Sequence, residues 1–374
     1  MRSARIVIVG AGFAGAASAY QLARRGARHV LLVEQERVAG YHASGRNASL
    51  VRQVIADQST MALACRGAAF LRDLPADWPA PVEYRRNGSM LLACGASWTA
   101  LQRDAERARA LGVEAEILSR ADASRRVEIL EDAEFDGALW CPTDGVVDIH
   151  ALLSGYLKQA ASYGAEIRYG CRLAAVDTRH GRVSRILLDS DWTAADVLVD
   201  AAGAWAGEVA AKAGAVNIPL RPLRRHLFVT GPLSWVKPHW PFVWDVAHGF
   251  YFRPDSGGLL LCPCDEDEMA ACDAPTSETA LELLAEKTRR YFPRFSDLPI
   301  MKGWAGLRTF APDGRFVIGW DPQLEGFFWV AALGGHGVTT SPAVGALVAD
   351  MILDGRASPF EEMSPARFIE KAAR

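Results

Sequence analysis

The sequence predicts an α/β fold with a parallel sheet, into which a second, β-rich α+β domain is inserted. Three stretches carry this prediction, because in each a short apolar run ends in small residues and continues into helix-forming residues: 6–15, 197–205 and 327–337. Such runs are typical of strands buried on both faces of a parallel sheet. Between them the pattern changes to short strands separated by Gly- and Asn-containing turns, which favours a separate domain.

The first run, residues 5–15, contains three glycines at the spacing of a dinucleotide-binding turn. Gly10 allows a tight turn after the strand, Gly12 lets the backbone approach a pyrophosphate, and Gly15 lets the next helix pack on the strand. A helix is expected over residues 13–24. Its N-terminal amide groups and the positive end of its dipole would face a phosphate.

A second strand is expected over residues 29–33, and Glu34 follows it directly. The Glu34 carboxylate can accept hydrogen bonds from ribose hydroxyls. Strand, glycines, helix, strand and acid thus occur in the order that a dinucleotide site requires. A Gly-rich turn in another kind of α/β protein is the alternative. The motif does not choose between NAD, NADP and FAD, although the acid argues against the 2′-phosphate of NADP.

Composition limits the class of protein. The chain has 374 residues, half of them hydrophobic, which is ordinary for a globular protein and long enough for two domains. The net charge of −3 gives no sign of nucleic-acid binding. No apolar run reaches the roughly 18 residues of a membrane span, and the first strand leaves no room for a signal peptide. A cytoplasmic protein is expected, with peripheral contact to the inner membrane left open.

The seven cysteines are scattered, and the only close pair is Cys262-Pro263-Cys264. No second pair follows at metal-binding spacing, so reduced thiols are expected rather than a zinc site or a disulfide, and no metal site is predicted.

The remaining elements are expected where the residue pattern changes. Asn87-Gly88 predicts a hairpin within residues 82–94, and residues 179–181 and 254–258 predict turns. Helices are expected over 57–73, 97–112, 150–163, 277–291 and 341–353, and strands over 166–176, 183–189 and within 220–264. The dinucleotide-binding domain is therefore predicted to comprise residues 1–82, 141–220 and 300–374, and the inserted domain residues 83–140 and 221–299.

Further stretches carry a family likeness: Gly40 to Asn47, Ala201 to Trp205, Trp304 to Phe310, and Glu325 to Ala332 running into Gly334 to Gly337. With the opening motif, they resemble the FAD-dependent D-amino acid oxidase superfamily over essentially the whole chain. The bacterial D-arginine dehydrogenase branch is the closest likeness. The resemblance implies a Rossmann-like FAD-binding domain of the glutathione-reductase type and selects FAD over NAD.

The resemblance also assigns the cofactor positions. It places the cofactor on the following residues: Gly10, Gly12, Ala14, Gly15 and Glu34 for adenosine; Ser44, Gly45, Arg46, Asn47 and Ala48 for the pyrophosphate and flavin edge; Leu173 for adenine; Ala202, Gly203 and Trp205 for a second segment; and Gly334, Gly335, Gly337, Val338 and Thr339 over the flavin. Members with covalent flavin use a cysteine near residues 310–315. No cysteine follows Cys272 here, so non-covalent FAD is expected.

The expected catalytic residues are Arg308, Tyr251, Arg225 and His336. Arg308 occupies the carboxylate-binding position of the family, where the guanidinium fork matches a carboxylate. Tyr251 matches the tyrosine whose hydroxyl joins it, and Arg225 matches a second arginine. A surface arginine, a solvated arginine cluster and a core tyrosine are the respective alternatives. His336 either tunes protonation of the substrate amine near neutral pH or packs on the flavin edge.

The implied activity is oxidative deamination of a D-amino acid to a 2-oxo acid and ammonia by hydride transfer to flavin. Ser89 stands where the D-arginine branch has the glutamate that receives a guanidinium, and Leu50 replaces a histidine. A neutral or apolar side chain is therefore expected, while Arg52 leaves an acidic substrate open.

Other activities stay open. Oxidation of a secondary amine of the sarcosine or glycine type, or of a 2-hydroxy acid, is the main alternative. A partner-dependent flavoprotein subunit is the third. The sequence does not choose between oxygen and a quinone-like electron acceptor.

Overall fold

The computed structural model describes residues 5–369, and its first sheet is built around the strand expected at residues 6–9. Strand β1 (Arg5–Val9) pairs in parallel with β2 (His29–Glu34) and with β13 (Val197–Asp200). The six-stranded sheet has the order β20 (Val317–Trp320), β21 (Phe327–Ala331), β13, β1, β2 and β9 (Glu166–Tyr169), and only β20 runs antiparallel to its neighbour. The expected parallel sheet is therefore present.

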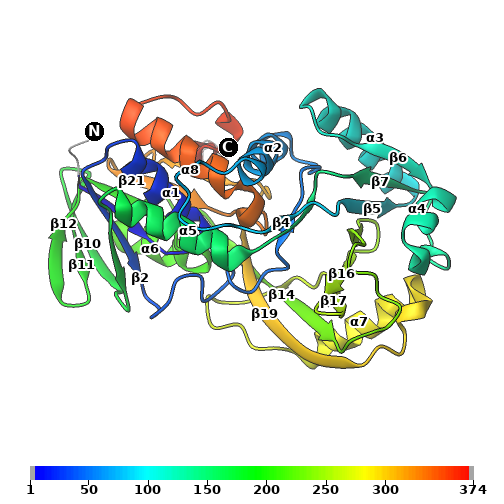
Figure 1. Ribbon diagram of the computed structural model, residues 1–374. Helices are drawn as coiled ribbons and strands as arrows, with labels where there is room; N and C mark the ends of the chain where they lie inside the picture. Colours follow the sequence, from blue (N-terminus) through cyan, green and yellow to red (C-terminus); the bar gives the residue numbers. More distant parts are fainter. Residues whose placement is uncertain (1–4, 370–374) are drawn as a thin grey trace.

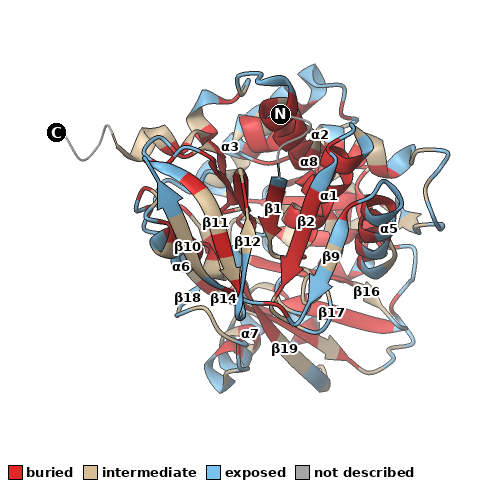
Figure 2. Ribbon diagram, turned by 90° about the vertical axis from the view of Figure 1, so that its left-hand side faces the viewer, coloured by how far each residue is buried: buried red, intermediate tan, exposed pale blue. Residues whose placement is uncertain are grey.

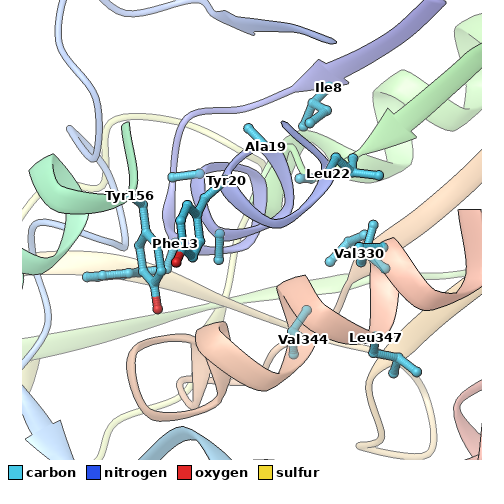
Figure 3. Close-up of a cluster of buried hydrophobic side chains, with 14 of the residues drawn as sticks. Ile8, Phe13, Ala19, Tyr20, Leu22, Tyr156, Val330, Val344 and Leu347 are labelled. Carbon is cyan, nitrogen blue, oxygen red and sulfur yellow. The ribbon is translucent and has the colours of Figure 1, made fainter. Parts of the chain in front are cut away.

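Helices cover one face of this sheet. Helix α1 (Phe13–Arg24) packs against α5 (Ile149–Ser162) and α8 (Gly337–Asp354), and α2 (Gln58–Arg72) packs on α8. The side chains of Ile8, Phe13, Tyr20, Tyr156 and Val344 meet in this layer (Figure 3). Because buried strands alternate their side chains between faces, Ile6 and Ile8 join this cluster, while Val7 joins the opposite one.

The opposite face is covered by a small sheet and a short helix. The small sheet contains β10 (Leu173–Arg179), β11 (Arg182–Leu188) and β12 (Asp191–Ala194), and α6 (Ala206–Ala213) packs against β10. Figure 2 shows that β1 and β2 lie buried between these layers. Because β1 and β13 are parallel neighbours, the turns that follow them lie at the same edge of the sheet.

A nine-stranded sheet forms the other side of the molecule (Figure 1). Helices α3 (Gly95–Ala110), α4 (Arg120–Arg126) and α7 (Glu278–Tyr291) pack on it. Its order is β18 (Asp267–Glu268), β14 (Arg221–Thr230), β17 (Gly258–Cys262), β16 (Phe250–Asp255), β15 (Phe242–Asp245), β5 (Ser89–Ala93), β7 (Gly137–Cys141) and β6 (Glu116–Ser119), with β19 (Ile300–Phe310) also paired to β14. A second small sheet, in addition to β10–β12, contains β3 (Leu50–Val51), β8 (Gly145–Val147) and β4 (Tyr84–Arg85).

Strands β14 and β19 form a long antiparallel ribbon, which Figure 1 shows running beside the rest of the sheet. Their register places Arg308 opposite Leu223 and Gly306 opposite Arg225. Residues two apart on a strand point to the same face, so Arg225 and Arg308 share one face of the ribbon.

Three sequence predictions are wrong in detail. The Asn87-Gly88 turn does not close a hairpin, because β4 pairs with β8 whereas β5 pairs with β15 and β7. The strand expected over 166–176 is two strands in different sheets, separated by Gly170 with a φ of 64°. The last long helix begins at Gly337, four residues before the expected position 341.

The division into two domains stays a prediction. Strand pairing, however, joins residues 300–310 to the sheet of the inserted domain. Residues 300–310 were assigned to the dinucleotide-binding domain, but as β19 they pair with β14 in the nine-stranded sheet. The outermost parts of the predicted ranges, 1–4 and 370–374, lie outside the described residues. Within residues 5–369, no helix is both long and apolar enough to cross a membrane.

Candidate active site

A cavity of about 430 Å3 lies where the carboxyl ends of β1, β13 and β21 meet one face of the nine-stranded sheet. Its lining includes the β1–α1 turn, residues 40–50, and the loop before α8. Every cofactor and substrate residue predicted from the sequence lies on the lining except Gly15, Gly45 and Ser89. A cavity at the carboxyl ends of parallel strands is the usual position of a ligand in such sheets.

One end of the cavity is made of backbone. Gly10 has a φ of 104°, and a Cβ atom there would lie 2.5 Å from the Ala201 carbonyl oxygen. Gly12 precedes α1 without a capping side chain, and a Cβ atom on it would lie 2.7 Å from Ser44 Oγ. Gly15 lies behind the lining, where a Cβ atom would lie 1.9 Å from the Gly10 carbonyl oxygen. Apart from that of Phe13, which donates to Ser44 Oγ, the first-turn amide groups of α1 are therefore available to an anion.

Glu34 is fixed beside this turn. Its Oε2 accepts a hydrogen bond from the Ala11 amide at 2.7 Å, and its Oε1 accepts one from the Glu36 amide at 2.9 Å. A carboxylate offers about four acceptor positions, so two remain for ribose hydroxyls.

A second helix starts at the same cavity. The loop before α8 contains Gly334 and Gly335, whose φ values are 51° and 89°. Helix α8 spans 18 residues, and no side chain caps its N-terminus. Two helix N-termini at one cavity favour a ligand with anionic groups, which fits a dinucleotide.

The segment 44–49 is held in place by hydrogen bonds and by an ion pair with Asp273. Ser44 Oγ accepts from the Phe13 amide at 3.0 Å, and Asn47 Nδ2 donates to the Ser44 carbonyl oxygen at 2.7 Å. Arg46 forms an ion pair with Asp273 at 2.5 Å. Gly45 faces away from the cavity, because a Cβ atom there would lie 2.4 Å from the Gly40 carbonyl oxygen.

The other end of the cavity is made of side chains on the nine-stranded sheet. Arg225 Nη2 and Arg308 Nη2 donate to the same Glu266 oxygen, Oε1, at 2.8 and 2.9 Å. Tyr251 is buried beside them, and burial raises the pKa of its phenol well above its usual value, so the hydroxyl keeps its proton. The Tyr251 ring lies 4.5 Å from the ring of Trp244, its cross-strand partner.

Comparison with known proteins identifies the family. Residues 5–351 match the family described as DAO, FAD dependent oxidoreductase. The chain belongs to the DAO family. Its cofactor is FAD, and the predicted α/β FAD-binding fold is confirmed.

Two curated relatives illustrate the breadth of the DAO family. The chain is 24% identical to FAD-dependent oxidoreductase domain-containing protein 1 of Bos taurus, over 94% of this chain and 81% of that protein. It is 25% identical to 4-methylaminobutanoate oxidase (formaldehyde-forming) of Paenarthrobacter nicotinovorans, over 94% of this chain and 44% of that protein.

Two solved structures are similar over nearly their whole length. The L-proline dehydrogenase from P. horikoshii has a TM-score of 0.87 at 23% identity and covers 99% of this chain and 98% of its own. The iminodiacetate oxidase from Chelativorans sp. BNC1 has a TM-score of 0.79 at 25% identity and covers 96% and 99%. These comparisons support the DAO family and amine or amino acid oxidation, but not the D-arginine dehydrogenase branch.

The surroundings of His336 do not favour titration near neutral pH. Burial, with the nearby guanidinium groups of Arg52 and Arg308, lowers the pKa of His336 to about 3. The imidazole is therefore neutral at physiological pH. The alternative expectation, that His336 packs on the flavin edge, stays a prediction.

Ser89 does not reach the cavity. It is fully buried, and its Oγ donates to Asp144 Oδ2 at 2.6 Å. Asp144 also accepts hydrogen bonds from the amide and side chain of Gln53, and burial raises the pKa of Asp144 to about 6. The position that receives a cationic side chain in the D-arginine branch is thus part of a buried polar network here.

Trp244 and Glu266 are among the lining residues that sequence reasoning did not assign. No sequence motif marks Trp244, and only its pairing with Tyr251 in the β15–β16 hairpin places it at the site. Glu266 lies in a run of four acidic residues, 265–268, which follows the Cys262 and Cys264 pair. All seven cysteines are free, and residues 5–369 contain no group of three His, Cys, Asp or Glu side chains placed to hold a metal.

Proposed function

We propose that this chain oxidises the carbon–nitrogen bond of a small amino acid that carries a secondary amine. One observation carries the proposal: Arg225 and Arg308 converge on a single carboxylate oxygen, that of Glu266, beside the protonated hydroxyl of Tyr251. The same geometry suits the carboxylate of a substrate, because paired guanidinium groups hold a carboxylate in a fixed orientation. Glu266 is about half exposed, which leaves its side chain room to move aside.

The residues of the chain orient the substrate rather than transfer its protons. Arg308 lies on the lining beside Gly335 of the α8 loop, so a carboxylate held by Arg308 is next to the flavin-covering segment. Neutral His336 adds no charge there. When bound, FAD supplies the two-electron acceptor for the reaction.

A secondary amine is favoured over a primary D-amino acid by the substrates that the relatives' names give. Both 4-methylaminobutanoate and iminodiacetate are secondary amines. The buried Ser89, which donates to Asp144, offers no carboxylate to a cationic substrate side chain. A primary D-amino acid is the second candidate, supported by the same carboxylate-binding arginines.

Anaerobic flavin bleaching tests the proposal. Purified holoenzyme is mixed with sarcosine, L-proline, iminodiacetate, neutral D-amino acids, D-arginine and 2-hydroxy acids, and the loss of yellow absorbance is followed. Rapid bleaching by a secondary amine supports the proposal. Bleaching by D-amino acids or hydroxy acids alone would replace it, and holoenzyme that no compound bleaches would favour a partner-dependent subunit. Peroxide formation in air then separates oxygen from a quinone-like acceptor.

A further inference from the structure

Arg52 is a guanidinium on the cavity lining that has no anionic partner. Its Nε atom is buried without a hydrogen-bond partner, and within residues 5–369 no carboxylate lies at ion-pair distance from it. The other lining arginines near it are paired, since Arg225 and Arg308 share Glu266. An unpaired charge in such a position is costly unless a bound anion compensates it.

The position of Arg52 is fixed by its neighbours. The Arg52 Cζ atom lies 4.3 Å from the centre of the Trp244 ring, and Trp244 in turn packs on Tyr251. The Arg52 amide donates to Thr339 Oγ1 at 3.3 Å, which ties it to the first turn of α8. Stacking on an aromatic face holds a guanidinium plane while leaving its edge free to bind.

The nearest buried acid does not neutralise Arg52 by contact. The oxygens of Asp144 accept hydrogen bonds from Gln53 and Ser89 instead. The substrate end therefore presents three guanidinium groups but one cavity-facing carboxylate, Glu266, which contacts only two of them.

We propose that Arg52 binds a second anionic group of the substrate, so that the preferred substrate is a small secondary amine with two carboxylates. Arg308 and Arg225 hold the carboxylate next to the reacting carbon, and Arg52, stacked on Trp244, holds the other. This assignment rests on the proposed function and narrows its substrate class.

A binding experiment tests Arg52 without turnover. Thiodiacetate and (methylthio)acetate differ by one carboxylate and contain no amine, so each can be titrated into holoenzyme while the FAD absorbance is recorded. We expect thiodiacetate to bind at least about 10-fold more tightly, since a charge-assisted hydrogen bond contributes on that order. In Arg52→Met this advantage disappears, while the Kd of (methylthio)acetate stays within about threefold.

Three results would overturn the assignment. One is equal affinity of the two ligands for the unmodified enzyme. Another is an equal loss of affinity for both in Arg52→Met, which would place Arg52 at the common carboxylate. A changed spectrum or FAD content in Arg52→Met, with both affinities unaltered, would assign Arg52 to the cofactor.

A kinetic comparison uses the matched substrates N-carboxymethylglycine and N-methylglycine. In Arg52→Met we expect kcat/KM for the dicarboxylate to fall about 10- to 100-fold, mainly through KM, while the value for N-methylglycine changes less than threefold. Arg52→Lys keeps the charge and should recover part of the loss. The exposed Arg66→Met is the control, with both values unchanged.

The two experiments separate failure of this assignment from failure of the proposed function. If no amine bleaches the flavin but thiodiacetate still binds through Arg52, the reaction is wrong and the anion site stands. If secondary amines are oxidised with no preference for a second carboxylate, the reaction stands and the role of Arg52 is refuted.

Discussion

The two ends of the cavity are built in different ways. At the dinucleotide end the ligand-facing groups are backbone amides of α1 and α8, exposed because Gly10, Gly12 and Gly335 have no side chains. At the substrate end they are side chains from strands β14, β16 and β19, and from residue 52. A backbone site accepts one kind of ligand with little variation, whereas a side-chain site can change its ligand by substitution alone.

The largest effect is expected from a side chain that fills the space of the dinucleotide. We expect Gly12→Val to weaken FAD binding at least about 100-fold, because the added atoms occupy the space of the pyrophosphate. The protein should still fold, since the nearest obstacle is the movable Ser44 Oγ at 2.7 Å. Bound flavin is measured from the ratio of absorbance at 450 and 280 nm, and folding by circular dichroism. Gly207→Ala, with no atom within 4 Å of the new Cβ, is the control and should keep its FAD.

The corresponding change at the substrate end should leave FAD in place. We expect Arg308→Met to lower kcat/KM for the amine substrate by about 100-fold, through loss of a charge-assisted carboxylate contact. Stopped-flow flavin reduction measures this. The control is Arg221→Met on the same ribbon, where the exposed side chain pairs with Glu268. Loss of FAD in Arg308→Met, or equal kinetic losses in both variants, would contradict a separate substrate end.

His336 lies on the cavity lining between the two ends. The pH dependence of the free energy of unfolding tests whether its imidazole is held neutral there. Its pKa is about 3 in the folded protein against 6.5 as the ordinary value, so the unfolded chain binds a proton that the folded chain does not. Stability is therefore lost as pH falls from about 6.5 toward 3. Between pH 7 and 5 the loss from this site is roughly 1–2 kcal/mol.

His336→Gln should remove that part of the pH dependence, as measured by urea unfolding of the holoenzyme at both pH values. Asp144 acts in the opposite direction, because its pKa is raised to about 6, but it is common to both proteins. If the two proteins lose the same free energy of unfolding, His336 is not held neutral by burial.

The smallest effect is expected at Ser89, which lies behind the substrate end. Ser89→Ala removes the hydrogen bond to Asp144 and should lower the free energy of unfolding by about 1 kcal/mol. The preference between neutral and cationic substrates should not change. A shift toward D-arginine or away from it, measured by flavin bleaching, would show that this side chain does reach the substrate.

The same contrast explains what could be predicted from sequence. The dinucleotide end is encoded by neighbouring residues, and Gly10, Gly12 and Glu34 all lie on the cavity as expected. The substrate end depends on the pairing of strands far apart in the chain. Arg225 and Arg308 are 83 positions apart, and only the β14–β19 register brings them to one face.

The errors have the same origin. The Asn87-Gly88 pattern is a good local hairpin signal, but long-range pairing places β4 and β5 in different sheets. Ser89 matches a pocket position by alignment, yet it is turned into the buried network around Asp144. Glu266 was missed because an acidic run looks like solvated surface until the fold places it against two arginines.

Gly335 has a consequence for changing this enzyme. A Cβ atom at this position would lie 2.8 Å from Arg308 Cδ, so the glycine loop before α8 leaves room for the Arg308 side chain. A larger residue at 335 is therefore compatible only with a shorter or displaced side chain at 308. A library that randomises position 335 alone should consist mostly of inactive clones, because each new side chain meets Arg308. Trp244 and Glu266 line the cavity on other segments, and diversification for new substrates is best begun there.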